Sequence, residues 1–227
     1  MQANSIKYSI ITMFIILTIS CIGKKYNGNS IKTNDSQTGE DTLKNVFLQK
    51  TDRLFVVGDF DGKGLNDTIF FSYYSNSSKT EINEIPSSSN NDWDDIVSWF
   101  AQSQVESCLT CKKDTLFIGF ACGLYCLFNI GDANSDGKDE VAFVVNWLDY
   151  SNINSCQIYS ICNNKWELLK QFTIHESAFS VPATDTMPTF SYIPGYLEKK
   201  SHIWMYREYD ALKGNNNMKV LHLKKCN

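Results

Sequence analysis

Short apolar runs separated by polar turns dominate this chain, and most of them have the length and composition of β-strands. They are rich in Val, Ile, Phe and Tyr, which favour pleated, half-buried positions. The predicted strands cover residues 54–57, 68–74, 115–120, 124–130, 141–147, 157–162, 166–174, 203–207 and 218–223. Between two of these strands, Asn163-Asn164-Lys165 has the composition of a tight hairpin turn.

One segment has a helical pattern instead. Trp93, Ile96 and Phe100 recur at the spacing of one helix face, and Asp92 precedes them as a candidate N-cap. We therefore predict a helix over residues 93–104 whose apolar stripe packs on the core. The whole pattern predicts an all-β, mostly antiparallel protein with one short helix, arranged as an incomplete β-propeller or as stacked β-meanders. A β-sandwich is the alternative.

The N-terminal region has a third pattern. Lys7 is its one charge, and residues 8–20 form an apolar run of about 13 residues, shorter than the roughly 20 that span a bilayer as a helix. The end of the run, Leu17-Thr18-Ile19-Ser20-Cys21, resembles a bacterial lipobox. That resemblance implies cleavage before Cys21 and a lipid on this cysteine, which would anchor the protein to a membrane. An ordinary signal peptide or an uncleaved anchor is the alternative.

These observations divide the chain into three parts. Residues 1–20 are the predicted lipoprotein signal peptide. Residues 21–45 are the lipidated cysteine and a tether rich in Gly, Asn, Ser, Thr and Lys. Residues 46–227 form the β-rich domain. The expected location is the bacterial cell envelope, with the outer membrane favoured.

Composition narrows the class of partner. Hydrophobic residues make up 43% of the chain, which is typical of a folded protein, and the formal net charge is −4. Lysines and arginines occur in pairs and form no larger cluster, so nucleic acid is not an expected partner. A protein or glycan partner is expected.

Candidate chemistry is concentrated in the segment from Asp132 to Glu140. Oxygen-bearing side chains occupy its positions 1, 3, 5 and 9 (Asp132, Asn134, Asp136, Glu140), and a glycine occupies position 6. Calcium takes six to eight oxygen ligands at about 2.3–2.6 Å, and a tight loop can direct alternate side chains toward one ion. Lys138, at position 7, would offer its backbone carbonyl. A plain Asp/Asn/Gly turn is the alternative.

A second copy of this pattern lies upstream. Asp59, Asp61 and Asp67 occupy its positions 1, 3 and 9, and Leu65 would offer the carbonyl of position 7. Asp132 follows Asp59 by 73 residues, a period that suggests repeated units. Position 5 is Lys63, which cannot ligate a cation. Either the Lys63 amine replaces the ion, or Lys63 points to solvent and the loop binds an ion weakly or not at all.

Both copies consist of a Gly-Asp pair, an Asp/Asn/Gly loop and an apolar strand. This string resembles the FG-GAP or integrin-α-type repeat, also found in VCBS-type bacterial surface proteins. The resemblance implies a calcium loop within a β-hairpin of a propeller blade. It places ligands at Asp132, Asn134, Asp136, Lys138 and Glu140, and weaker ones at Asp59, Asp61, Leu65 and Asp67. About three such blades would fit in the chain.

The cysteines leave several possibilities open. Apart from Cys21 there are seven, so at least one is unpaired. Cys108 and Cys111 have the spacing of a redox or zinc motif, but a local disulfide or two unpaired thiols is the favoured interpretation. Cys122 with Cys126, and Cys156 with Cys162, would each share a strand face. Their connectivity does not follow from the sequence.

These features favour a non-enzymatic, calcium-stabilised, membrane-anchored binding module. An inhibitor or immunity protein resembling lysozyme inhibitors is one alternative, and a glycan-acting enzyme is another. For an enzyme the candidate carboxylates are Asp92, Asp94, Asp95, Glu106, Glu81 and Glu84. Their clustering in sequence is not the opposed geometry that glycoside cleavage needs.

Overall fold

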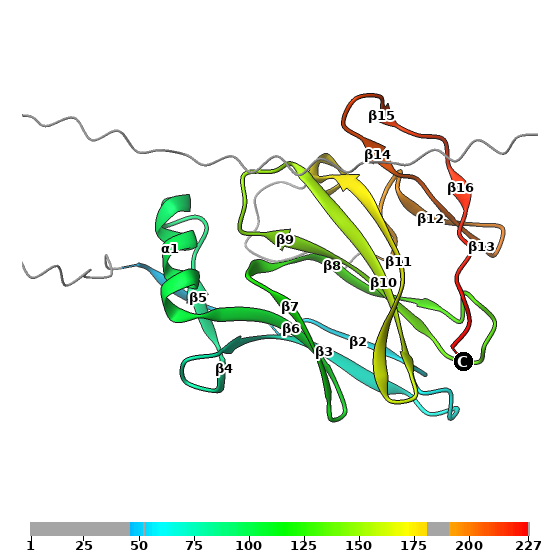
Figure 1. Ribbon diagram of the computed structural model, residues 1–227, viewed down its shortest axis with the longest axis horizontal. Coiled ribbons are helices and arrows are strands. Elements are labelled where there is room, and N and C mark those ends of the chain that lie inside the picture. Colours follow the sequence, from blue (N-terminus) through cyan, green and yellow to red (C-terminus); the bar gives the residue numbers. More distant parts are fainter. Residues whose placement is uncertain (1–45, 52, 181–190, 227) are drawn as a thin grey trace, which may run out of the picture. The chain divides into compact units, whose positions relative to one another are not determined.

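The computed structural model describes residues 46–51, 53–180 and 191–226. The predicted signal peptide (residues 1–20), the lipidation residue Cys21 and the tether (residues 21–45) lie outside the described residues. The chain divides into two units, 1–41 and 42–227, and every described residue belongs to the second. Figure 1 labels most of its helices and strands. Within the described part of the chain, no helix is long and apolar enough to cross a membrane.

A first antiparallel sheet contains five strands: four lie in the order β2-β3-β6-β7, and the short strand β4 pairs with β3. The strands of this sheet are β2 (Phe55–Gly58), β3 (Asp67–Ser75), β4 (Thr80–Ile82), β6 (Val105–Cys111) and β7 (Asp114–Gly119). Alternate residues of β6, among them Leu109 and Cys111, are buried in the core. The sheet is therefore covered on one face.

The predicted helix is inserted between the strands of this first sheet. Helix α1 (Trp93–Ser103) begins after Asp92 and buries Ile96 and Phe100, as the apolar stripe predicts. Asp92 has the extended backbone of an N-cap residue, but its side chain makes no capping hydrogen bond. A separate pair of strands, β1 (Leu48–Lys50) and β5 (Glu84–Pro86), precedes the helix.

A second antiparallel sheet is a simple meander in which four strands follow one another in chain order. They are β8 (Ala121–Gly131), β9 (Glu140–Trp147), β10 (Ile153–Cys162) and β11 (Lys165–His175). The predicted hairpin joins β10 to β11, where Cys162 pairs with Lys165 across Asn163 and Asn164. Both asparagines have positive φ, at 53° and 59°, as a type I′ turn requires.

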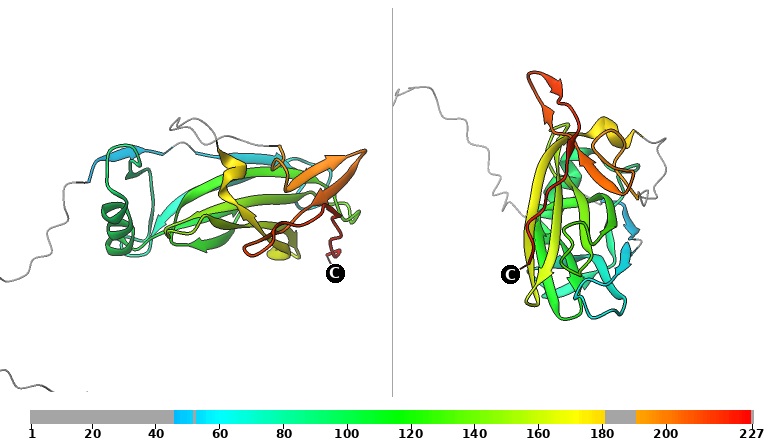
Figure 2. Two further views of the ribbon diagram at one scale, coloured as in Figure 1. Left: turned by 90° about the horizontal axis from the view of Figure 1, so that it is seen from above. Right: turned by 90° about the vertical axis from the view of Figure 1, so that its right-hand side faces the viewer.

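The remaining elements follow β11 along the chain (Figure 2). They are a 3-10 turn, η1 (Glu176–Phe179), and five short strands: β12 (Leu197–Lys200), β13 (Ile203–Tyr206), β14 (Tyr209–Asp210), β15 (Gly214–Asn215) and β16 (Lys219–Val220). Strands β12, β13 and β16 form a third sheet, and β14 pairs with β15.

The second sheet is buried on both faces, and β9 shows why. Val141, Phe143 and Val145 belong to the core cluster shared with the first sheet and α1, whereas Ala142 and Val144 belong to a second cluster shared with β12 and β13. Successive side chains of a strand point to opposite faces, so a continuous apolar run serves two cores.

The predicted all-β, mostly antiparallel fold is confirmed. The five-stranded first sheet and the four-stranded second sheet share one core, and the third sheet covers the other face of the second sheet, so the arrangement is one of stacked β-meanders. A β-sandwich has two layers, and the described residues form more than two. Strand β6 was not among the predicted strands.

Candidate metal centre

The two predicted loops occupy equivalent places in the two meanders. The first loop (residues 59–67) joins β2 to β3, and the second loop (residues 132–140) joins β8 to β9. Positions 4 and 6 have positive φ in both loops: Gly62 at 73° and Gly64 at 74° in the first, Ser135 at 59° and Gly137 at 88° in the second. The repeat inferred from sequence is thus also a repeat of backbone conformation.

In the second loop, the acceptor oxygens of Asp132 and Asn134 turn inward and bind the loop's own backbone. The Asp136 amide donates to Asp132 Oδ1 at 2.9 Å and to Asn134 Oδ1 at 2.9 Å. The Gly137 amide donates to Asp132 Oδ2 at 3.0 Å. These bonds fix the side chains at positions 1 and 3 before any ligand arrives.

The first loop repeats this set of bonds atom for atom. The Lys63 amide donates to Asp59 Oδ1 at 3.0 Å and to Asp61 Oδ1 at 3.2 Å, and the Gly64 amide donates to Asp59 Oδ2 at 2.8 Å. The two loops therefore share one scaffold and differ in what their side chains add to it.

The second loop gathers three carboxylates around one point. Oxygens of Asp132, Asp136 and Glu140 lie within 4.8 Å of one another. Glu140 is fully buried; its Oε2 accepts from the Ala133 amide at 2.8 Å, but its Oε1 has no hydrogen-bond partner among the described residues. Burial, with a smaller contribution from the charges of Asp136 and Asp132, raises the pKa of Glu140 to about 8.

This arrangement fits a hard divalent cation. Two oxygens bound to one calcium at about 2.3–2.6 Å lie at most about 5 Å apart, and the three carboxylates meet that limit. The donors are all oxygens, which suit calcium rather than a softer metal. The Lys138 amine lies outside the loop, 3.2 Å from the Ile161 carbonyl. It therefore does not occupy the loop interior, where an ion would bind.

In the first loop, a lysine from another hairpin lies among the acids. Lys112, in the turn between β6 and β7, contacts Asp61 Oδ2 and lies 2.8 Å from Asp67 Oδ1. The hydrogen bond from Lys112, with a smaller contribution from Lys63, lowers the pKa of Asp61 to about 2. The two carboxylates in turn raise the pKa of Lys112. Asp67 Oδ2 is buried and unpartnered in the described structure, the counterpart of Glu140 Oε1.

The position of Lys63 agrees in part with the prediction that its amine takes the place of an ion. Its amine lies 2.7 Å from Asp61 Oδ2, while 69% of its side chain is exposed. Lys63 therefore pairs with an acid of the loop, but Lys112, which sequence reasoning missed, bridges Asp61 and Asp67. Lys112 is distant from residues 59–67 in sequence. It lies beside them because Ile69 pairs with Cys111 across β3 and β6.

The two loops are joined directly. The Asp59 amide donates to Asp139 Oδ2 at 3.0 Å, and the Asp139 amide donates to the Asp59 carbonyl at 3.0 Å. Asn129 also donates to Asp139 Oδ2, at 2.7 Å. A Cβ at Gly58 would come within 2.3 Å of the Asn129 side chain, so this close approach requires glycine.

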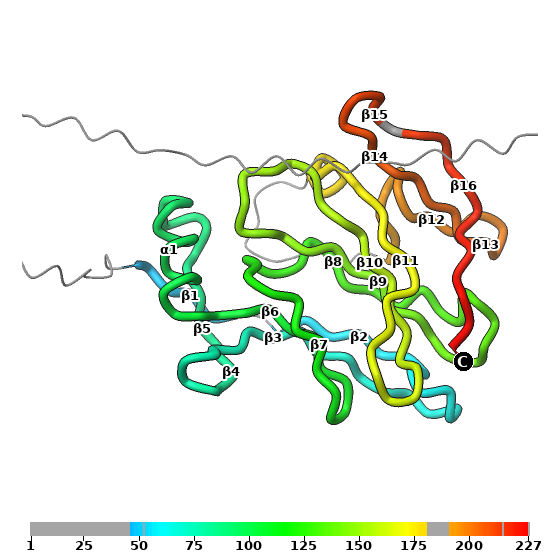
Figure 3. The backbone as a smooth tube through the Cα atoms, viewed as in Figure 1, coloured from blue at the N-terminus to red at the C-terminus, as the bar shows by residue number. Residues whose placement is uncertain are grey.

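The C-terminal segment closes over the second loop (Figure 3). Asn134 Nδ2 donates to the Lys224 carbonyl at 2.9 Å, and the Cys226 amide donates to Asp136 Oδ2 at 2.8 Å. A disulfide between Cys226 and Cys162 ties this segment to the end of β10. Asn134 Nδ2 donates within the loop as well, to Asp136 Oδ2 at 3.0 Å, while its Oδ1 accepts from the Asp136 amide.

The other cysteines of the described residues are unpaired thiols: Cys108, Cys111, Cys122, Cys126 and Cys156. Cys108 and Cys111 lie in the middle and at the end of strand β6, not at the start of a helix. Of the two favoured possibilities, a local disulfide or two unpaired thiols, the structure shows the second. Burial raises the pKa of Cys111 to about 11 and that of Cys122 to about 12, which keeps both protonated and unreactive at neutral pH.

Two of the carboxylates considered for an enzyme have structural partners. Asp94 accepts a hydrogen bond from the Tyr150 hydroxyl, and Glu81 lies 3.7 Å from the Arg53 guanidinium. Asp94 and Asp95 lie in the first turn of α1, where acids favour the helix dipole. Their grouping in sequence thus has a structural cause.

Comparison with known proteins adds no information about this site. A scan against protein-family models, a search of curated proteins and a search of solved structures all found no match. The resemblance to FG-GAP loops therefore stays a prediction that depends on residues 59–67 and 132–140 of this chain.

Proposed function

We propose that this protein is a non-enzymatic binding module of the bacterial envelope, anchored through a lipid on Cys21, whose β-domain is stabilised by one calcium ion in the second loop. The observation that carries the metal proposal is the Glu140 carboxylate, which is fully buried, faces Asp132 and Asp136, and has one oxygen without a partner among the described residues. A bound cation would satisfy that oxygen.

The electrostatics support calcium as a structural element. Without a cation, three neighbouring acids repel one another, and the buried Glu140 must take up a proton or bear an uncompensated charge. A divalent ion removes both costs, and only the folded loop brings the ligands together. Binding to the folded state alone adds RT ln(1 + [Ca²⁺]/Kd) to stability, about 2.7 kcal/mol at 100 times Kd.

In the first loop, we assign the role of the cation to Lys112. Its ammonium group contacts the same two positions, 3 and 9, that would hold an ion in the second loop. Its positive charge also opposes the entry of a cation. The expected stoichiometry is therefore one calcium per chain, although the two loops have the same backbone.

A calcium titration of the full-length protein tests the proposal. Calcium should raise Tm by about 5–10 °C at 100 times Kd, since 1 kcal/mol corresponds to about 2–4 °C in a domain of this size. Asp61→Asn, which changes an acid of the first loop, is the control. It should lower Tm with and without calcium and leave the calcium-induced shift intact. If calcium neither shifts Tm nor gives binding heat, the metal proposal is wrong.

A further inference from the structure

Residues 224–226 of the C-terminal segment lie across the second loop and bind two side chains that the calcium proposal makes ligands. The Cys226 amide donates to Asp136 Oδ2 at 2.8 Å. Asn134 Nδ2 donates to the Lys224 carbonyl at 2.9 Å. Groups that orient a metal ligand by a hydrogen bond from outside the site typically change metal affinity by about 10–100-fold. These residues are therefore placed to set how tightly the loop binds an ion.

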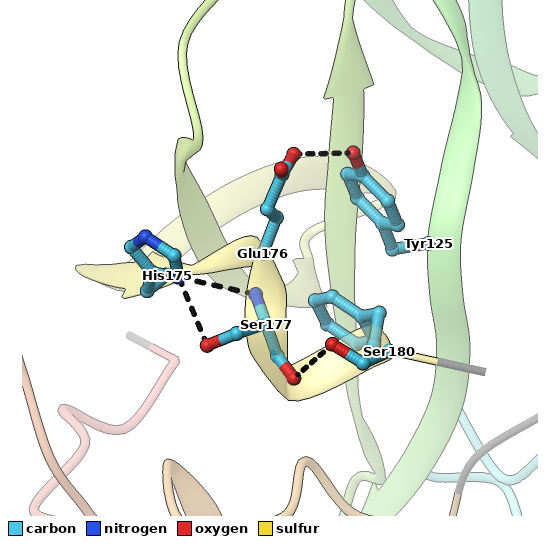
Figure 4. Close-up of a pocket in the computed structure, with 6 residues that line it drawn as sticks. Tyr125, His175, Glu176, Ser177 and Ser180 are labelled. Atoms are coloured by element: carbon cyan, nitrogen blue, oxygen red, sulfur yellow. Dashed lines mark hydrogen bonds between the residues drawn. The ribbon is translucent and has the colours of Figure 1, made fainter.

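Contacts with distant parts of the chain hold these residues. Residues 224–226 belong to no helix or strand, and within the described chain their hydrogen bonds and ion pair reach partners 57 to 90 positions away. Figure 4 shows the opposite case in η1, where the Ser177 amide donates to His175 Nδ1 at 3.1 Å and the Ser180 hydroxyl donates to the Ser177 carbonyl at 2.9 Å. Bonds between near neighbours need little chain ordering, whereas contacts between distant segments must offset the cost of bringing those segments together.

One covalent bond ties residues 224–226 to the rest of the domain. Cys226 forms a disulfide with Cys162, the last residue of β10. Leu223 packs against the second core cluster, so it stays anchored without the disulfide. Ordering the backbone of one residue costs at least as much free energy as one hydrogen bond contributes, and ordering the lysine side chains adds to that cost. The hydrogen bonds therefore do not hold residues 224–226 on the loop once the disulfide is broken.

A reductant can reach this disulfide from the side of Cys226, which is half-buried, whereas Cys162 is 6% exposed. One thiolate of a dithiol attacks Cys226 Sγ, the bond between the two sulfurs breaks, and Cys162 leaves as a thiolate that takes up a proton. The second thiolate of the dithiol then displaces Cys226, which is protonated in turn. The dithiol ends as a disulfide, and two electrons have passed to the protein.

We propose that thiol–disulfide exchange at Cys162 and Cys226 regulates calcium binding by the second loop. The oxidised protein binds calcium tightly, and the reduced protein, which releases residues 224–226, binds it about 10–100-fold more weakly. This inference rests on the proposed calcium site and names its regulation. The coupling is reciprocal, so calcium favours the oxidised form by the same factor and protects the disulfide against reduction.

Lys225 acts in the opposite direction. Its amine donates to the Ser135 carbonyl at 2.7 Å, which places a positive charge on the loop while the disulfide is intact. Release of residues 224–226 would remove this charge and favour a cation. Lys225 is exposed, however, and water and salt screen its charge, whereas the lost hydrogen bonds act directly on the ligand side chains. We therefore expect the loss of these bonds to outweigh the loss of the charge.

Calorimetric calcium titration of the full-length protein, before and after reduction with dithiothreitol, tests the proposal. Kd should rise by about 10–100-fold on reduction and return on reoxidation. The double change Cys162→Ser and Cys226→Ser should bind calcium as weakly as the reduced protein and should not respond to dithiothreitol, which separates this disulfide from the unpaired thiols. Lys225→Met, which keeps the disulfide and removes only the charge, should bind calcium at least as tightly as the parent.

A redox titration in dithiothreitol buffers measures the reciprocal effect. Saturating calcium should lower the midpoint potential of the disulfide by about 30–60 mV, which is the 10–100-fold change converted at about 30 mV per tenfold for two electrons. Alkylation of free thiols followed by mass spectrometry reports the reduced fraction. Circular dichroism of the same samples reports whether the reduced protein keeps its sheets.

Two results would overturn the inference alone. One is calcium binding that is equally tight in the oxidised and reduced protein, with an unchanged midpoint potential. The other is loss of the folded circular dichroism signal on reduction, because global unfolding rather than release of residues 224–226 would then explain a weaker affinity. The absence of calcium binding in both redox states contradicts the metal proposal itself, and the regulation falls with it.

Discussion

The two loops share their place in a meander, their positive-φ positions and their internal hydrogen bonds, yet their acids have different neighbours. In the first, Lys112 from the neighbouring hairpin contacts Asp61 and Asp67. In the second, position 5 is Asp136, the acids face one another, and the C-terminal segment holds Asn134 and Asp136 in place. The loop sequence thus determines the backbone, whereas tertiary neighbours determine whether an ammonium group reaches the acids.

The largest expected effect comes from the disulfide that holds the C-terminal segment on the second loop. Cys162 and Cys226 are 64 residues apart, for which a chain-entropy estimate gives about 4 kcal/mol of stabilisation. The double change Cys162→Ser and Cys226→Ser should lower the free energy of unfolding by an amount of this order. It should also weaken calcium binding, because the Cys226 amide no longer positions Asp136.

Urea denaturation with and without calcium measures both effects. Cys122→Ser, at a half-buried unpaired thiol, is the control and should leave calcium affinity unchanged. Calcium affinity that survives loss of the disulfide would show that the second loop needs no support from the C-terminal segment.

Glu140→Gln removes the negative charge of the proposed ligand while keeping its shape. In EDTA the variant should be about as stable as the parent at pH 7, because the pKa of Glu140 lies near 8 and the metal-free acid is largely neutral. The calcium-induced rise of about 5–10 °C should disappear. Thermal unfolding in the two conditions distinguishes the roles: a variant that is destabilised in EDTA and still responds to calcium would make Glu140 a purely structural residue.

The double change Lys63→Asp and Lys112→Met should convert the first loop into a copy of the second. It restores an acid at position 5 and removes the amine that contacts positions 3 and 9. We expect calorimetry to report two calcium ions per chain in place of one. Lys63→Asp with Lys113→Met, which keeps Lys112, is the matched control and should stay at one.

The smallest expected effect concerns the bond between the loops. Asp139→Ala removes the acceptor of the Asp59 amide and of Asn129, which should cost about 1–2 kcal/mol in the free energy of unfolding. Asp92→Ala, at a helix start whose side chain makes no capping bond, should cost less. Equal losses in urea denaturation would show that the two loops fold independently of each other.

Local pattern was enough to predict much of this molecule. The two loops, the Asn163-Asn164 turn and helix α1 follow from residues that are neighbours in sequence, and they were predicted within a few residues of their observed bounds. The apolar run of β9 was predicted as a strand because β-branched residues fill it. Each of these signals has a local physical cause.

The features that could not be predicted depend on contacts between distant segments. Strand β6 contains Glu106, Ser107 and Cys108 where a typical strand has β-branched residues, and its pairing with β3 makes it a strand. Lys112 reaches the first loop only through that pairing. Cys226 reaches Cys162 only because the C-terminal segment crosses the second loop, and no spacing in the sequence encodes that path.

Counting the calcium ions bound to each chain is the most direct test of the account. Equilibrium dialysis of the full-length protein against calcium, with the bound metal measured by atomic absorption, should give one ion per chain and none for Glu140→Gln. Two ions per chain would show that Lys112 does not replace a metal in the first loop, and none would show that the acids of the second loop do not form a calcium site.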